Sequence, residues 1–194
     1  MKRALLFTVM VASIAHAEGG WLTARGRLQP ELRLEAWGST DSAGAGFVRP
    51  DEGARSAWSA ELGYAYFNRV FEARGNRVWQ VLPTAFTTIS FTAGGVLHVV
   101  PEGVFDVGFG PVAGFNLSFG GNTFTVDLGL LSSIEAFVAQ YFTRFPQRLQ
   151  IGFNVRAGPL VFGLHARAGV DLAVDQLFVM KGELALTFGW LSSR

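Results

Sequence analysis

The sequence predicts an all-β fold: an antiparallel up-and-down transmembrane β-barrel of eight strands. Three observations lead to this prediction. Apolar residues alternate with small or polar ones along most of the chain, which is the period of a β-strand. Glycine occurs 24 times and lysine only twice among 194 residues, which is unusual for a soluble surface. After the N-terminal segment, no apolar run is long enough for a membrane-spanning helix.

The first 17 residues have the features of a cleaved secretory signal peptide. Lys2 and Arg3 form a basic start, an apolar stretch covers 4–15, and Ala15-His16-Ala17 is an A-x-A cleavage site. The apolar stretch is shorter than the roughly 20 residues of a membrane anchor, which argues against that alternative. We therefore expect a single exported domain over 18–194.

Composition excludes several classes of function. The chain is 49% apolar and 16% charged, which argues against a disordered protein. Cleavage would remove two of the 16 basic residues and none of the 15 acidic ones, so the net charge near −1 gives no reason to expect nucleic-acid binding. The sequence has no cysteine and no histidine cluster, so we expect neither a metal nor another cofactor.

Eight stretches are expected to form strands, because each has one apolar face and one small or polar face. In chain order, they cover about 22–37, 56–67, 79–100, 104–120, 123–130, 148–157, 160–172 and 178–191. Their apolar faces include, in the same order, Leu34, Trp58, Phe91, Phe115, Leu128, Phe153, Phe162 and Phe188.

Four tight turns give testable registers, because a hairpin must place like faces opposite each other. A two-residue turn at Gly121-Asn122 would pair Phe119 with Phe124, and a three-residue turn over 101–103 would pair His98 with Asp106.

The other two turns lie near the C-terminus. A turn at Gly158-Pro159 would pair Val155 with Phe162, and a loop over 173–177 would pair Arg167 with Glu183. The segments 38–55, 68–78 and 139–147 are polar or rich in turn formers, and we expect them to be loops.

The polarity of the two faces indicates which one meets lipid. In a soluble sandwich or barrel, which is the alternative, the outer face would carry charged residues rather than many glycines. Glycine suits the crowded interior of a narrow barrel, so the apolar face is expected to be outside. The expected lipid-facing residues are Trp58, Tyr64, Phe91, Phe109, Phe115, Phe124, Leu128, Phe153, Phe162, Phe188 and Trp190.

With these features the chain resembles the small eight-stranded outer-membrane β-barrels, the class of the OmpA transmembrane domain and OmpX. The resemblance is one of pattern and covers the whole chain after the signal peptide. It implies a location in the Gram-negative outer membrane, with both termini in the periplasm and the segments 38–55, 101–103, 139–147 and 173–177 outside. It also implies that 68–78 is periplasmic. Members usually end on an aromatic residue, whereas four residues follow Trp190 here.

The inner face carries ionisable residues, and an eight-stranded barrel has room only for side chains. We expect these residues to form an ion-paired network, with Arg167 and Glu183 as one pair. The members are Arg33, Glu35, Glu61, Asp106, Asp127, Glu135, Arg156, His165, Arg167, Asp171, Lys181 and Glu183. His98 and Asp106 are expected to form a further pair at one mouth.

Three functions are consistent with this sequence. The first is a structural or recognition role without catalysis, in contact with outer-membrane lipid and lipopolysaccharide and with an envelope partner at loops 38–55 and 139–147. The second is a narrow channel for ions or small apolar solutes. The third is a lipid A-modifying enzyme, because His98, Asp106, Ser133 and Glu135 include the residue types of a hydrolase triad.

Overall fold

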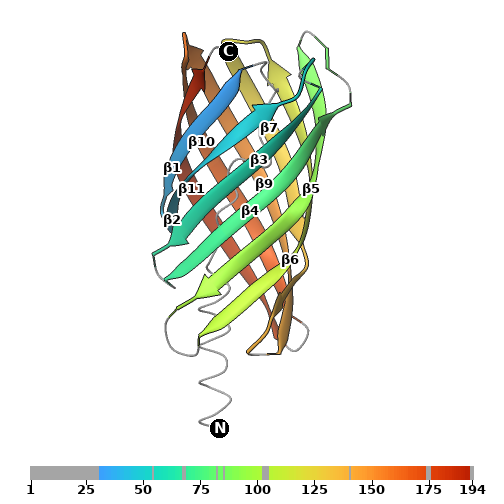
Figure 1. Cartoon of the computed structure of the whole chain (residues 1–194), viewed down its shortest axis with the longest axis vertical. Helices are drawn as coiled ribbons and strands as arrows, with labels where there is room; N and C mark the ends of the chain where they lie inside the picture. The colour runs from blue at the N-terminus through green and yellow to red at the C-terminus, as the bar shows by residue number, and fades with distance from the viewer. Residues whose placement is uncertain are drawn as a thin grey trace.

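The computed structural model describes a closed antiparallel β-barrel (Figure 1). The described residues are 31–53, 55–66, 69–81, 83–84, 86–101, 105–139, 141–173 and 176–192. The strands are β1 (Leu32–Ser39), β2 (Ser42–Pro50), β3 (Ser56–Ala65), β4 (Val70–Gln80), β5 (Thr87–Val100), β6 (Asp106–Gly120), β7 (Phe124–Ser133), β8 (Glu135–Phe137), β9 (Phe142–Ala157), β10 (Leu160–Ala173) and β11 (Gln176–Ser192). The predicted signal peptide, 1–17, and residues 18–30 lie outside the described residues.

The barrel has ten strands around its wall, not the eight that we expected. Apart from β7 and β8, each strand pairs with its neighbours in chain order, and β1 closes the ring by pairing with β11. β7 and β8 follow one another along the same wall, between β6 and β9. They are separated at Ile134, opposite Pro111, which has no backbone N–H to donate to the ladder.

The two additional strands come from segments that we expected to be loops. Half of 38–55 is β2, and most of 68–78 is β4. The segment 139–147 likewise belongs largely to β9, which begins at Phe142. The expected strand 79–100 is divided between the end of β4 and β5. All three loop predictions were wrong because the outward faces of these segments also contain small or polar residues, such as Ala43, Gly75 and Thr143, so that the alternation of apolar and polar residues is weak there.

Two of the four predicted registers are confirmed. Val155 lies opposite Phe162, and Arg167 lies opposite Glu183. The other two are shifted by two residues: Phe119 lies opposite Val126, and His98 lies opposite Gly108. A shift of two leaves every side chain on the predicted face, because strand side chains alternate with a period of two.

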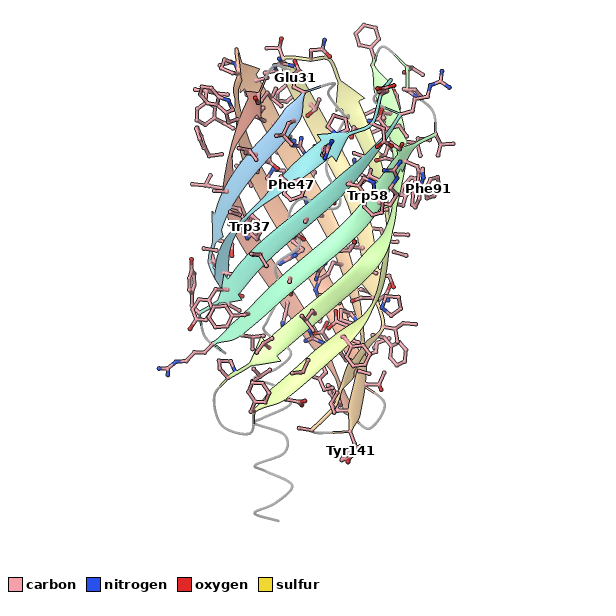
Figure 2. The ribbon with its side chains drawn as sticks, viewed as in Figure 1. Glu31, Trp37, Phe47, Trp58, Phe91 and Tyr141 are labelled. Carbon is pink, nitrogen blue, oxygen red and sulfur yellow. The ribbon has the colours of Figure 1, made fainter. Side chains whose placement is uncertain are left out.

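The two ends of the barrel can be distinguished by the strand ends. We call the end where β1 begins and β11 finishes the terminal end, and the opposite end the distal end. In Figure 2, Glu31 marks the terminal end at the top, and Tyr141 marks the distal end at the bottom. The β3–β4 connection therefore lies at the distal end, rather than at the end of the termini as predicted for 68–78.

The outer face is apolar around the barrel. Leu62 is 68% exposed, Leu186 67% and Trp58 57%, although these side chains prefer burial. All of the predicted lipid-facing residues point outward, and each is at least partly exposed. The inner face contains instead buried Glu, Asp, Arg, Ser, Thr and Asn side chains.

Candidate functional site

The interior of the barrel holds the ionisable side chains that were predicted to face inward. Among the predicted members, eight are buried and four are half-buried. The buried ones are Glu35, Glu61, Asp106, Asp127, Glu135, His165, Arg167 and Asp171. The half-buried ones are Arg33, Arg156, Lys181 and Glu183. Arg33 pairs with Glu35 at 3.5 Å, and Arg156 pairs with Glu31 at 3.1 Å near the terminal end.

One group of charges begins on β3, β4 and β5. The Arg74 Nε donates to Glu72 at 2.6 Å and lies 4.0 Å from Glu61. Glu72 also lies 3.5 Å from the Nδ1 of His98, the residue directly opposite it on β5. Alternation places Glu72, Arg74 and His98 on the inner face, and the register brings them to one level.

The group continues across the lumen-facing side of β6. His98 Nε2 lies 3.0 Å from the carboxylate of Glu135 on β8. Glu135 accepts a hydrogen bond from the Arg144 Nε at 2.7 Å, and Arg144 Nη2 lies 2.5 Å from the same oxygen. The Arg144 guanidinium also lies over the ring of Phe137, at 5.3 Å. Arg144, Glu135 and His98 are each no more than 1% exposed.

The last part of the group lies on β9, β10 and β11. Asp171 is hydrogen-bonded to Arg148 and lies 3.9 Å from Arg144 and 3.8 Å from Lys181. Arg167 is hydrogen-bonded to Glu183, whose other oxygen accepts from Ser42 at 3.1 Å.

These residues form a network that we call the charged network. Its members are Glu61, Glu72, Arg74, His98, Glu135, Arg144, Arg148, Arg167, Asp171, Lys181 and Glu183. Apart from the histidine, the five acidic members balance the five basic members. Because each charge lies near an opposite one, the cost of burying it is offset.

Glycines on neighbouring strands provide room for the large inner side chains. A Cβ at Gly152 would lie 2.2 Å from His165 Nδ1, and one at Gly108 would lie 2.4 Å from the Phe137 ring. At Gly44, a Cβ would lie 2.2 Å from the Trp37 ring. These distances are shorter than the non-bonded contacts that a Cβ atom makes in proteins. The inner glycines therefore reflect side-chain crowding in the lumen.

The interior differs between the two ends. Toward the distal end, Phe137 packs with Ala65, Val70 and Val100 in an apolar layer, with Phe142 beside it. Toward the terminal end, the wall is mostly uncharged and polar. Its buried polar residues include Ser59, Asn76, Thr88, Ser90, Thr92, Asn116, Ser118, Gln150 and Thr187.

The predicted pair of His98 and Asp106 is not formed. His98 instead contacts Glu72 and Glu135, because the register places it beside Gly108. The Asp106 carboxylate accepts backbone hydrogen bonds from Val107 and Ala139, both at 2.7 Å. It therefore holds the connection after β8 at the distal end.

The triad residues are also joined in a different order from that of a hydrolase. In a catalytic triad, the histidine lies between the nucleophile and the acid. Here Ser133 donates to Glu135 at 2.6 Å, and Glu135 in turn contacts His98. The acid lies in the middle, so the histidine is not placed to take the proton of the serine.

Four members of the charged network were missed from the sequence: Glu72, Arg74, Arg144 and Arg148. Glu72, Arg74 and Arg144 lie in segments that were assigned to loops, and Arg148 is the first residue of the expected strand 148–157. Their even spacing, at 72 and 74 and at 144 and 148, was the available signal, since residues two or four apart share a face of a strand.

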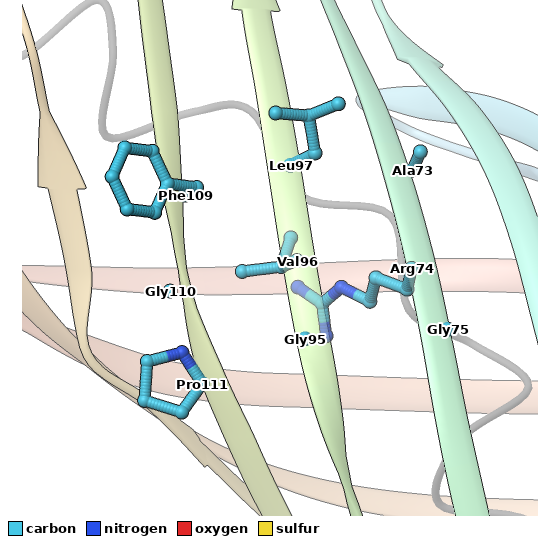
Figure 3. A pocket seen from close by; sticks show the side chains of 9 residues that line it. All are labelled: Ala73, Arg74, Gly75, Gly95, Val96, Leu97, Phe109, Gly110 and Pro111. Carbon is cyan, nitrogen blue, oxygen red and sulfur yellow. The ribbon is translucent and has the colours of Figure 1, made fainter.

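A shallow apolar pocket of about 640 Å³ lies across β4, β5 and β6 (Figure 3). The small residues Gly75, Gly95 and Pro111 line the floor of this pocket, and Leu97 and Phe109 flank it.

Within the described ranges, no group of three or more His, Asp or Glu side chains is placed to bind a metal. No helix in the described part of the chain is long and apolar enough to cross a membrane.

No protein-family model matches the sequence, and the comparison with curated proteins finds no match. Among solved structures, the chain is similar to the outer membrane channel DcaP of Acinetobacter baumannii, with 10% identity and a TM-score of 0.42 over 86% of this chain and 60% of that one. It is also similar to CdiB from Acinetobacter baumannii, with 13% identity and a TM-score of 0.38 over 81% of this chain and 34% of that one. The chain therefore spans less than two thirds of either protein.

Proposed function

We propose that the protein is an integral outer-membrane β-barrel with a structural role in the envelope, its lumen closed by the charged network. The observation that carries the proposal is the arrangement of a closed barrel that is apolar outside and ion-paired inside. Only helices and closed barrels satisfy every backbone hydrogen bond within a bilayer. An exported barrel with this polarity is best suited to the outer membrane.

The distribution of outward aromatic residues supports residence in a bilayer. Near the terminal end, the outer face carries Trp58, Trp79, Phe119, Phe124, Phe162 and Trp190. Near the distal end, it carries Tyr64, Tyr66, Phe71, Phe109 and Tyr141. Aliphatic residues such as Leu128, Leu164 and Leu184 lie between the two groups. Aromatic girdles on either side of an apolar band are typical of membrane barrels.

The location has a direct test. Membranes of the source cell are fractionated, and the protein is compared on gels with and without heating. A folded outer-membrane barrel should appear in the outer-membrane fraction and change its mobility on heating. A water-soluble protein with unchanged mobility would contradict the proposal.

A closed lumen predicts a lack of conductance. The wild-type barrel, refolded and added to a planar bilayer, should show no discrete conductance steps. The recording should be compared with that of a double variant, Glu135→Ala with Arg144→Ala, in which the buried pair is removed. Steady, discrete conductance from the wild type would contradict the closed lumen.

A narrow channel is the second candidate, and the polar, uncharged wall of the terminal half favours it. Hydroxyl and amide side chains such as those of Thr92 and Asn116 can line a path for small solutes. In that case the charged network would act as a gate. Discrete wild-type conductance that depends on voltage or pH would support this candidate over the structural one.

We propose no catalytic role, because the contacts of His98 suit an ion-paired interior. An enzyme acting on lipid A through His98 would lose that activity in the variant His98→Ala. Identical lipid A profiles in wild-type, variant and deletion cells are expected. Any partner would bind the outer surface or the short turns, and co-purification from detergent-solubilised outer membranes tests for it.

A further inference from the structure

A second pocket, of about 510 Å³, lies on the outer rim of the β2–β3 hairpin near the terminal end. Its lining contains two apolar side chains, one basic and two acidic ones. These are Phe47, Trp58, Arg49, Asp51 and Glu52, together with Pro50. Figure 2 shows Phe47 and Trp58 on the strands that face the viewer.

The pocket lies where the outer surface changes from apolar to polar. Arg49 lies opposite Trp58, and Trp58 lies opposite Arg77, so two outward arginines flank one outward indole. Toward the middle of the barrel, the next outward residues are Phe47 and Ala60. Beyond the row lies the polar turn that begins at Asp51. In a bilayer, this row would lie at the level of the headgroups.

Two of the charged side chains in this region, Arg77 and Asp51, already pair with each other. The Arg77 guanidinium packs over the Trp58 ring at 5.0 Å and is hydrogen-bonded to Asp51 and Ser56. The hydrogen bond from Arg77 lowers the pKa of the Asp51 carboxyl below its ordinary value, and Ser56 adds to the effect. The Asp51 charge is therefore neutralised by protein groups.

The other two charged side chains, Arg49 and Glu52, are available to a ligand. Arg49 and Glu52 are exposed and line the same pocket. Within the part of the chain that the structure describes, they form no ion pair within 4.0 Å with one another or with a neighbour, and Arg49 acts on Asp51 only through a weaker attraction at longer range. A pocket with separate positive and negative groups above an apolar floor is complementary to a zwitterionic amphiphile.

We infer that this pocket binds a phospholipid with a phosphate and a primary ammonium in its headgroup, such as phosphatidylethanolamine. The phosphate accepts hydrogen bonds from the Arg49 guanidinium, and the ammonium donates to the Glu52 carboxylate. The first carbons of an acyl chain lie along Phe47 and Trp58. The inference rests on the proposed membrane residence and adds a lipid preference to it.

Native mass spectrometry of the refolded full barrel in detergent tests this inference. The probes are short-chain phosphatidylethanolamine, phosphatidylglycerol and phosphatidylcholine, titrated separately. The wild type should retain phosphatidylethanolamine about fivefold better than either of the others, which corresponds to one exposed ionic contact of about 1 kcal/mol. Equal retention of the three lipids, or preference for either other lipid, would overturn the inference.

Two variants separate the roles of the charges. Glu52→Gln should reduce retention of phosphatidylethanolamine to the level of phosphatidylglycerol and leave that of phosphatidylglycerol unchanged. Arg49→Gln should weaken retention of all three lipids, because all contain the phosphate. Arg55→Gln, in the same turn but outside the pocket lining, is the matched control and should match the wild type. Unchanged retention in Arg49→Gln or Glu52→Gln would contradict the site.

The outcome is independent of the test of membrane residence. Each variant is first checked for the heat-dependent gel shift, so that loss of lipid cannot be attributed to unfolding. A wild type without that shift would count against the proposed function, whereas a shifted wild type without lipid preference would count against this site alone.

Discussion

Replacing Arg144 with methionine tests how the barrel interior is stabilised. The arginine is 1% exposed and lies 2.5 Å from Glu135 and 3.9 Å from Asp171. Methionine keeps most of the length of the side chain and removes the charge. The two carboxylates would then remain buried with less compensation.

The expected loss of stability follows from the contacts that remain. Removing one partner of a buried ion pair costs about 3–5 kcal/mol. Glu135 would retain His98 at 3.0 Å and Ser133 at 2.6 Å, and Asp171 would retain Arg148. These remaining partners place the expected loss near the lower limit, at about 3 kcal/mol.

Urea unfolding of the barrel in lipid vesicles, followed by tryptophan fluorescence, measures this loss. Adding Glu135→Gln to the variant should restore about 1–2 kcal/mol, because the unpaired carboxylate is removed. Arg156→Met is the matched control: that arginine pairs with Glu31 at the rim, so about 0–1 kcal/mol is expected. A loss of unfolding free energy under about 1 kcal/mol for Arg144→Met would refute the ion-pair argument. So would a double variant in which Glu135→Gln restores no stability.

Three further outcomes are expected. Gly152→Ala should destabilise the barrel by about 1–3 kcal/mol because its Cβ would meet His165, whereas Gly182→Ala, with nothing within 4 Å, should be neutral in the same unfolding assay. Leu184→Arg, on the outward face at the middle of β11, should cost about 2–4 kcal/mol in vesicles, and a neutral result would argue against a lipid-facing position. The Asp51 carboxyl should titrate below pH 3.8 by NMR. Its ion pair with Arg77 therefore stabilises the fold above pH 3.8, and this stabilisation is lost as the pH falls through the lowered pKa. A titration midpoint above pH 3.8 would contradict the pairing.

The strand count shows where sequence patterns fail in this protein. The segment that forms β2 contains Gly44 and Gly46, and composition alone predicts a loop. Gly44 is required because the Trp37 ring from the adjacent strand occupies the space of its side chain. Strand propensity cannot anticipate this, because the decisive contact is made between strands.

The same reason explains the missed and misassigned charges. Turn residues identified the hairpins, but a turn does not distinguish registers that differ by two residues. The shift between β5 and β6 moved His98 from Asp106 to Glu135, across β6. Which ion pairs form therefore depends on register and on the two strands that were not predicted.

In the eight predicted strands, the sequence by itself determined which side chains point outward and which inward, since alternation has a period of two and survives a register shift of two. It also determined the polarity of the two faces, because that polarity is a property of composition at alternate positions. Only the tertiary structure decided the number of strands, the closure between β1 and β11, and the partner of each charge. These depend on contacts between strands, and the energy of a buried charge is set by the atoms a few ångströms away rather than by its place in the sequence.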